Sequence, residues 1–188
     1  MRDDPAGVAR LSTLVSAARN GDARAQRSLV EAVWPDAFRI ARTVLRDAQL
    51  AQDVAQEACV HLLIKIGSLR QPASFRPWFY RLVTRQAYAR LRRSPVETPL
   101  DDVKDLPAPG NGAGDLMDLR QAIRALPPNY RLPLLFHYYL GLSDRETAQA
   151  LGTTTGAIRV RLSVARRRLR LVLEDHSPPA STAISVRQ

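Results

Sequence analysis

The sequence LSDRETAQALGTTTGAIRVRLSVARRRLR, residues 142–170, decides the fold of the carboxyl-terminal half of this chain. Ser143, followed three positions later by Glu146, is typical of the capping box that begins a helix. Gly152 predicts the end of that helix, because helices often close on a residue in the left-handed conformation. A longer helix follows, with six arginines and no acid. The pattern predicts a helix-turn-helix with a nucleic-acid-binding face.

The longer helix has an apolar side and a basic side. Four apolar residues at helical spacing would face Ala148 and Leu151 of the first helix, and they are Ile158, Leu162, Ala165 and Leu169. The opposite side carries Arg159, Val160, Ser163 and Arg167. Arginine can form paired hydrogen bonds with guanine and valine can pack on the thymine methyl group, so this side is able to contact base edges. The flanking residues Arg161, Arg166, Arg168 and Arg170 are better placed for phosphates. The alternative is a solvated basic face without a partner.

Composition favours a polyanionic partner. The chain has 188 residues, a formal net charge of +10 and a pI near 10.9. Nucleic acid is preferred to a membrane, because we find no apolar run of about 18 residues and no signal-peptide pattern at the amino terminus. We therefore expect a cytoplasmic protein.

Catalytic and metal-binding patterns are missing from the sequence. Cys59 is the single cysteine and lies on an apolar helical stripe, so we expect a buried thiol, with redox sensing as the alternative. His61, His137 and His176 are far apart in sequence and have no ligand partners at metal-site spacing. No phosphate-binding glycine loop, nucleophile elbow or carboxylate pair occurs. We expect no cofactor, no metal and no enzymatic activity.

The chain is predicted to be all-α, with two small helical domains joined by a flexible linker and the helix-turn-helix in the second. Residues 1–93 form the first domain, with helix breaks near residues 20–21, 34–35 and 46–47 and a loop at 67–76. Residues 94–117 contain four prolines, three glycines and five acids, which predicts an acidic linker. Residues 118–175 form the second domain, and residues 176–188 are predicted to be a disordered tail.

Two surfaces of the first domain differ in charge. Between Glu57 and Glu97 there is no acid, while seven arginines accumulate among five aromatic residues. Basic groups can follow a phosphate backbone and aromatic rings can stack on unpaired bases, which is typical of single-strand binding. The alternative is that most of these rings form core, above all Trp78 and Phe79, which share a stripe with Leu82.

The preceding helix, residues 47–66, turns its apolar residues inward and presents Gln49, Gln52, Asp53, Gln56 and Glu57 outward. Asp53 and Glu57 are like charges one helical turn apart, an arrangement that destabilises an isolated helix slightly. In an otherwise basic protein this pair indicates a basic protein partner. A merely solvated face is the alternative.

These stretches resemble a known family. DAQLAQDVAQEACVHLL (47–63), SFRPWFYRLVTRQAYARLRR (74–93) and the segment 126–170 are similar, in the same order, to bacterial RNA polymerase sigma factors of the extracytoplasmic-function (ECF) group. The resemblance implies a protein that binds core polymerase, recognises the −10 and −35 promoter elements and promotes DNA melting. It implies no chemistry of its own.

The resemblance also implies roles for residues. Gln52, Asp53, Gln56 and Glu57 would bind the clamp helices of the beta-prime subunit, and residues 126–140 would dock on the flap of the beta subunit. The −10 strand would meet Ser74, Arg76, Trp78, Tyr80, Arg81, Arg85, Tyr88, Arg92 and Arg93. The −35 duplex would meet Thr155, Gly156, Arg159, Val160, Arg161, Ser163, Arg166, Arg167 and Arg170. An anti-sigma factor is a hypothesis from the family pattern alone.

The sequence departs from the family at three positions. Arg85 and Ala89 stand where the family commonly has Asn and Asp, and Val164 stands where an Arg is frequent. The promoter preference implied by the resemblance is therefore open.

Two other functions compete with the sigma-factor hypothesis. An operator-binding regulator would use the same helix-turn-helix, but it leaves the acidic helix and the basic aromatic segment unexplained and needs a dimer interface that the sequence does not supply. A DNA-processing enzyme such as a recombinase needs metal-binding carboxylates or a nucleophile in a folded core. The acids of this chain instead cluster on one helix and in the linker.

Overall fold

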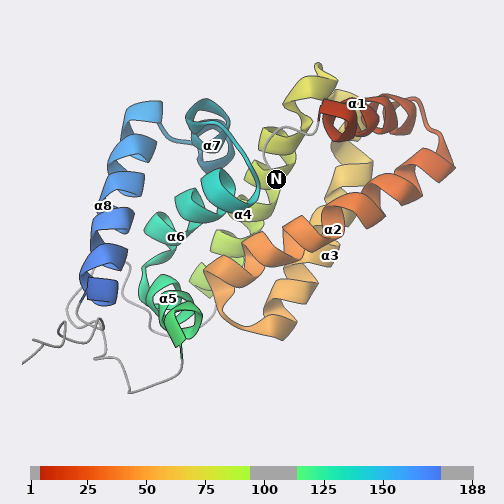
Figure 1. Cartoon of the computed structure of the whole chain (residues 1–188). Coiled ribbons are helices and arrows are strands. Elements are labelled where there is room, and N and C mark those ends of the chain that lie inside the picture. Colours follow the sequence, from red (N-terminus) through yellow and green to blue (C-terminus); the bar gives the residue numbers. More distant parts are fainter. Residues whose placement is uncertain (1–4, 94–113, 175–188) are drawn as a thin grey trace, which may run out of the picture.

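The computed structural model describes residues 5–93 and 114–174 (Figure 1). Every regular element in these two ranges is a helix, which confirms the predicted all-α fold class. The two ranges form an amino-terminal and a carboxyl-terminal helical unit. Most of the predicted linker and the predicted tail lie outside the described residues. No described helix is long and apolar enough to span a membrane.

The amino-terminal unit is built on three long helices that follow a shorter one. Its elements are α1 (Pro5–Arg19), α2 (Ala23–Leu45), α3 (Ala48–Lys65), the 3-10 turns η1 (Ile66–Ser68) and η2 (Pro72–Ser74), and α4 (Phe75–Arg93). Asp22 and Asp47 are the N-caps of α2 and α3, and the Asp22 carboxylate accepts two hydrogen bonds and the Asp47 carboxylate one from amides of the first turn. The predicted loop at 67–76 is thus two tight turns, and α4 begins at Phe75.

Two of the three predicted helix breaks are confirmed. Gly21 and Arg46 adopt positive φ angles of 86° and 58°, which end α1 and α2. The predicted break at residues 34–35 is wrong, because α2 continues through Pro35. A proline inside a helix removes a backbone donor and crowds the preceding turn. The buried stripe of α2, which includes Val33 and Ala37 on either side of the proline, holds the helix against its neighbours.

The core of this unit lies where α2, α3 and α4 pack on one another. Leu29, Ile40, Leu62 and Phe79 are fully buried there. Burial of each such side chain contributes about 1.5–3 kcal/mol. Phe79 is therefore core, as the alternative interpretation predicted, whereas Trp78 is only half-buried.

The carboxyl-terminal unit contains the helix-turn-helix. Its elements are α5 (Gly114–Ala125), α6 (Pro128–Leu134), the π-helical turn η3 (Leu135–Tyr139), α7 (Asp144–Leu151) and α8 (Thr155–Glu174). The capping box of Ser143 and Glu146 is formed, and Gly152 ends α7 with φ 63°. The predicted apolar side of α8 packs on Ala148 and Leu151. The helix α5 begins at Gly114, inside the segment predicted as linker.

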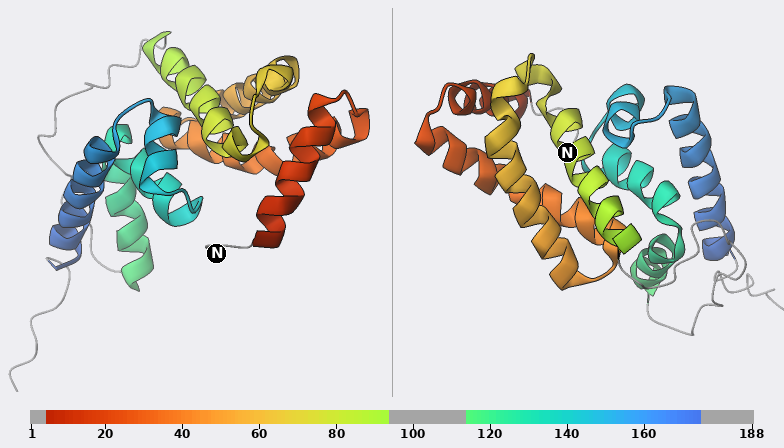
Figure 2. Two further views of the ribbon diagram at one scale, coloured as in Figure 1. Left: turned by 90° about the horizontal axis from the view of Figure 1, so that it is seen from above. Right: turned by 180° about the vertical axis from the view of Figure 1, so that it is seen from behind.

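The two units pack against each other through α4, which lies at the centre of the molecule (Figures 1 and 2). The rings of Tyr80 in α4 and Phe136 in η3 stack with centroids 5.7 Å apart. The Tyr80 hydroxyl donates to Asp36 of α2 at 2.6 Å. Arg76 donates to the carbonyl oxygen of Leu140, so backbone, ring and carboxylate contacts converge on the first two turns of α4.

The buried state of Cys59 gives a prediction. Its thiol is 5% exposed, and burial raises its pKa to about 11. At pH 8 only about one thiol in a thousand would be ionised, and the thiolate is the reactive form. We expect a thiol-specific chromogenic reagent to label the native protein at pH 8 at least tenfold more slowly than the protein unfolded in guanidinium. Equal labelling rates would show that the thiol is accessible.

Candidate nucleic-acid interface

The second helix of the helix-turn-helix is fixed by its start and by its apolar side. The Thr154 hydroxyl accepts a hydrogen bond from the amide of Ala157 at 3.2 Å, which caps the first turn of α8. Ile158, Leu162 and Ala165 are buried against α6 and α7. The opposite side is solvent-exposed and presents the four residues predicted to contact bases, Arg159, Val160, Ser163 and Arg167. Val160 is 63% exposed, so its methyl groups are accessible to a partner.

A carboxylate orients the first arginine of this face. Arg159 Nε donates to Asp144 Oδ2 at 3.1 Å, and Asp144 lies 3.5 Å from His137 Nδ1. Sequence reasoning missed Asp144, because its position after the N-cap already explains an acid by the helix dipole. The ion pair holds the Arg159 side chain across the start of α7 in the unbound protein.

The remaining predicted −35 residues occupy different positions. Gly156 and Arg170 are exposed, while Thr155 and Arg161 are half-buried. Arg166 donates to the carbonyl oxygen of Leu162 within its own helix. Arg168 lies with its guanidinium 4.7 Å from the ring centre of Tyr130, so it packs on α6. Among the flanking arginines, Arg170 is exposed and has no side-chain hydrogen bond or ion pair with another described residue, so it can reach a phosphate.

A second basic surface is a cleft of about 860 Å³ between α3, α4 and α7. Five of the predicted −10 residues line it together, namely Trp78, Arg81, Arg85, Tyr88 and Arg92. The wall formed by α7 consists of Ala150, Leu151 and Gly152. The cleft therefore combines cationic and aromatic groups as a single-strand site requires, with the helix-turn-helix as one of its walls.

The other predicted −10 residues lie elsewhere on α4 or before it. Ser74 and Arg76 are half-buried and Arg93 is exposed. Tyr80 is 2% exposed, and burial together with the charge of Asp36 raises its pKa strongly. In this packed arrangement Tyr80 has no ring face free to stack on a base.

The acidic surface lies on α3. Gln52, Asp53, Gln56 and Glu57 are all exposed. Three exposed apolar residues continue the same side of the helix toward its end, and they are Val60, Leu63 and Ile64. Sequence reasoning missed them, although the available signal was that Val60 lies three residues after Glu57, and Leu63 and Ile64 lie three and four residues after Val60. The side of α3 that faces solvent is thus acidic at its start and apolar at its end.

No group of three or more potential metal ligands occurs among the described residues.

Two family models match the chain. Sigma-70 region 2 matches residues 29–95, and Sigma-70, region 4 matches residues 116–169. The first match includes α3, α4 and the walls of the basic aromatic cleft that these two helices form. The second includes most of α5, all of α6 and α7, and most of α8, so the two matches together cover more than half of the chain.

Known proteins of similar sequence or fold are named as sigma factors. The chain is 30% identical to the ECF RNA polymerase sigma factor ShbA of Streptomyces griseus subsp. griseus, over 93% of this chain and 100% of that protein. It is 33% identical to the probable RNA polymerase sigma factor RfaY of Xanthomonas campestris pv. campestris, over 80% of this chain and 40% of that protein. A solved structure of similar fold is that of the sigma factor RpoE in complex with the anti-sigma factor NepR from Bartonella quintana. It has a TM-score of 0.63 and 22% identity, and the match covers 80% of this chain and 98% of that one.

The two arginine positions on α8 lead to a prediction. Arg159→Ala should weaken discrimination at one or two base pairs by about 1–3 kcal/mol, because a paired contact to a base edge is lost. Arg170→Ala should lower affinity for all sequences alike and reduce the salt dependence, because it removes a phosphate contact. Fluorescence anisotropy on duplexes selected from a randomised pool measures both effects. Equal loss on every duplex from both variants would contradict the assignment of the base-contacting face.

Proposed function

Because the chain belongs to the sigma-70 family, as an RNA polymerase sigma factor of the extracytoplasmic-function group, we propose that three of its surfaces divide promoter recognition between them. As a sigma factor it binds core RNA polymerase, recognises the −10 and −35 promoter elements and promotes melting of the DNA. The observation that carries the division is the spatial separation of an acidic side of α3, a basic aromatic cleft beside α4 and a basic exposed side of α8.

We assign the −35 element to α8. Arg159, Val160 and Ser163 are exposed within one and a half turns near the start of the helix, where a recognition helix contacts bases. Asp144 holds Arg159 before DNA arrives. Replacing this carboxylate by a guanine edge exchanges one charge-assisted hydrogen bond for a pair of hydrogen bonds, so the exchange costs little on the correct base.

We assign the melted −10 strand to the cleft between α3, α4 and α7. Trp78 and Tyr88 supply rings, and Arg81, Arg85 and Arg92 supply charge. Opening a duplex costs a few kcal/mol for each unstacked step, and binding of the separated strand must offset that cost. The wall formed by α7 limits access, so we propose that the two helical units separate when the strand binds. Separation would also release Arg76 and Tyr80.

We assign the contact with the polymerase clamp to the exposed side of α3. The carboxylates of Asp53 and Glu57 are free of ion pairs with any described residue. The adjacent apolar residues Val60, Leu63 and Ile64 extend the surface. A basic patch flanked by apolar groups on the polymerase would complement it.

Fewer residues of the segment 126–140 are accessible to the beta flap than the resemblance implied. Leu126, Leu132 and Phe136 are buried in the two cores of the protein. Tyr138 and Tyr139 remain exposed, at 47% and 60%. We propose that these two rings form the contact with the flap.

We further propose that the chain has no enzymatic activity, works in the cytoplasm and is held inactive by an anti-sigma factor. The first two proposals follow from the family, whose members are non-catalytic initiation factors that act with polymerase. The third is supported by the fold shared with the sigma factor RpoE, which was solved together with an anti-sigma factor.

Binding to polymerase tests the assignment of α3. Replacing Asp53 and Glu57 together by Lys should abolish co-elution with sigma-free core polymerase in size exclusion, because charge complementarity is reversed. Glu31→Lys is the control, since Glu31 is an exposed acid on α2 outside the surface. Unchanged co-elution of the double variant would remove α3 from the interface. No co-elution of the unaltered chain, with DNA binding intact, would favour an operator-binding regulator.

Binding of single-stranded DNA tests the cleft. The double replacement Arg85→Ala with Arg92→Ala should weaken binding of single-stranded oligonucleotides and lower the salt slope by about 0.7 for each arginine. Arg27→Ala, an exposed arginine on α2, should leave both unchanged. Anisotropy titrations at several salt concentrations give the slopes. A loss of the same size in the Arg27→Ala control would show that binding is non-specific.

A further inference from the structure

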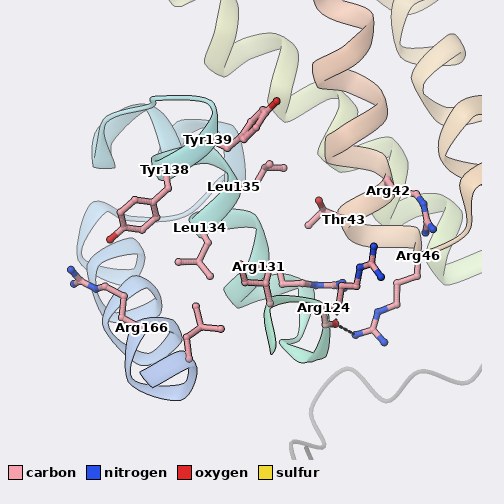
Figure 3. A pocket seen from close by; sticks show the side chains of 12 residues that line it. Arg42, Thr43, Arg46, Arg124, Arg131, Leu134, Leu135, Tyr138, Tyr139 and Arg166 are labelled. Carbon is pink, nitrogen blue, oxygen red and sulfur yellow. Dashed lines mark hydrogen bonds between the residues drawn. The ribbon is translucent and has the colours of Figure 1, made fainter. Parts of the chain in front are cut away.

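A second cleft lies on the other side of the contact between the two units (Figure 3). Its volume is about 910 Å³, and it opens between α2 and the elements α5, α6, η3 and α8. It shares no residue with the clamp surface or the −10 cleft, but Tyr138 and Tyr139 of the proposed flap contact and Arg166 of the predicted −35 set are among its lining residues. Its walls come from both units, so the cleft exists only while the units are packed together.

The cleft is cationic and contains no acid among its lining residues. Its five arginines are Arg42, Arg46, Arg124, Arg131 and Arg166. Arg46 donates to the carbonyl oxygen of Arg124 at 3.0 Å, and Arg131 donates to the same oxygen at 3.4 Å. Two guanidinium groups from different units thus share one acceptor. Two guanidinium groups that bind the same oxygen lie close enough to repel each other, and an anion bound between them would remove the repulsion.

Arg131 is the most deeply placed of the five. It is 6% exposed, and its Nε and Nη2 atoms are buried without a hydrogen-bond partner. Burial and the charge of Arg46 lower its pKa to about 10, so it remains charged at neutral pH. A buried cation with unpaired donors is strongly unfavourable unless an anion compensates it. Nε and Nη2 form the edge of a guanidinium that binds a phosphate or a carboxylate with two parallel hydrogen bonds.

One side of the cleft is apolar. Leu134, Leu135 and Leu169 line it together with the rings of Tyr138 and Tyr139. The combination of an arginine cluster with apolar and aromatic groups suits a ligand that has an anionic end and an organic body.

We propose that this cleft binds a small phosphorylated anion that bridges the two helical units. Rotation of the Arg131 side chain would present its buried Nε–Nη2 edge to the phosphate, and Arg42 and Arg46 approach from the α2 wall. The apolar side receives the organic part of the ligand, such as a nucleoside. Because the ligand binds only the packed arrangement, it stabilises that arrangement by mass action.

A small anion fits the geometry better than a macromolecule does. Arg131 is recessed, and a DNA backbone would meet the exposed Arg42 and Arg124 without reaching it. An acidic protein segment is the other candidate, and the experiment separates it from a small anion.

The test is isothermal titration of the full chain, without DNA or polymerase, using inorganic pyrophosphate and a nucleoside diphosphate as probes at constant ionic strength. We expect one saturable site. The variant Arg42→Ala, at an exposed residue of the α2 wall, should weaken it about tenfold, as loss of one charged contact does. Arg27→Ala, on the same helix as Arg42 but outside the cleft, is the matched control and should bind as the unaltered chain does. A thermal unfolding midpoint that rises with ligand concentration in the unaltered chain, and not in Arg42→Ala, would support the same conclusion.

The relative affinities of the two probes and of the control variant decide between the possible ligands. Tighter binding of the nucleoside diphosphate supports the role of the apolar side, and equal binding of both probes supports a site for the phosphate alone. Equal weakening in the Arg27→Ala control would overturn the proposal in favour of non-specific attraction to a basic protein. Binding of a glutamate-rich helical peptide without binding of either probe would overturn it in favour of an acidic protein partner. Failure of this proposal would leave polymerase and promoter binding unaffected, because neither is measured here.

Discussion

The packing of α4 against α7, joined by the contact of Tyr80 with η3, is the interaction on which the arrangement of the whole molecule depends. The ring of Tyr80 is enclosed by Phe79 and Phe136, and its hydroxyl donates to Asp36, so one side chain joins α2, α4 and η3. Arg39 of α2 adds a cation–π contact with Tyr139 at 4.2 Å. Because α7 and α8 follow directly from η3, these contacts determine where the recognition helix lies relative to the first unit.

The helix α4 has two roles, one in the contact between the units and one in the proposed −10 cleft. The start of α4 holds the two units together through Arg76 and Tyr80, while its middle and end supply the cationic side of the cleft through Arg85 and Arg92. A DNA strand that used the whole length of α4 would have to break the first set of contacts. A ligand shifts such an equilibrium only by the difference between its affinities for the two states. Polymerase and promoter would therefore have to bind the separated arrangement better by at least the free energy of the contact between the two units.

Local features of the structure could be predicted from the sequence, and long-range ones could not. The capping box at Ser143, the left-handed Gly152 and the buried stripe of α8 depend on residues three or four apart, so their spacing is sufficient. The break predicted at Pro35 was wrong, because a local rule was overridden by packing along α2. The burial of Tyr80 depends on Phe136, which lies far along the chain, and the tether of Arg159 depends on Asp144. Candidate binding residues could be named by type, but which of them share a cleft depended on the packing of the two units.

Arginines of both units lie close together at one side of the contact between the units. The acids of the described amino-terminal unit serve as helix caps, lie on the exposed surface of α2 and α3, or pair as Asp36 does, and none of them approaches Arg131. The apolar and aromatic contacts of Phe136 must therefore hold the units together against repulsion between Arg46 and Arg131. A nearby anion would remove that repulsion, and an increase in separation would remove it as well. The free energy difference between the packed and separated arrangements is thus smaller than the buried apolar area alone implies. A small difference would allow polymerase and promoter to separate the two units.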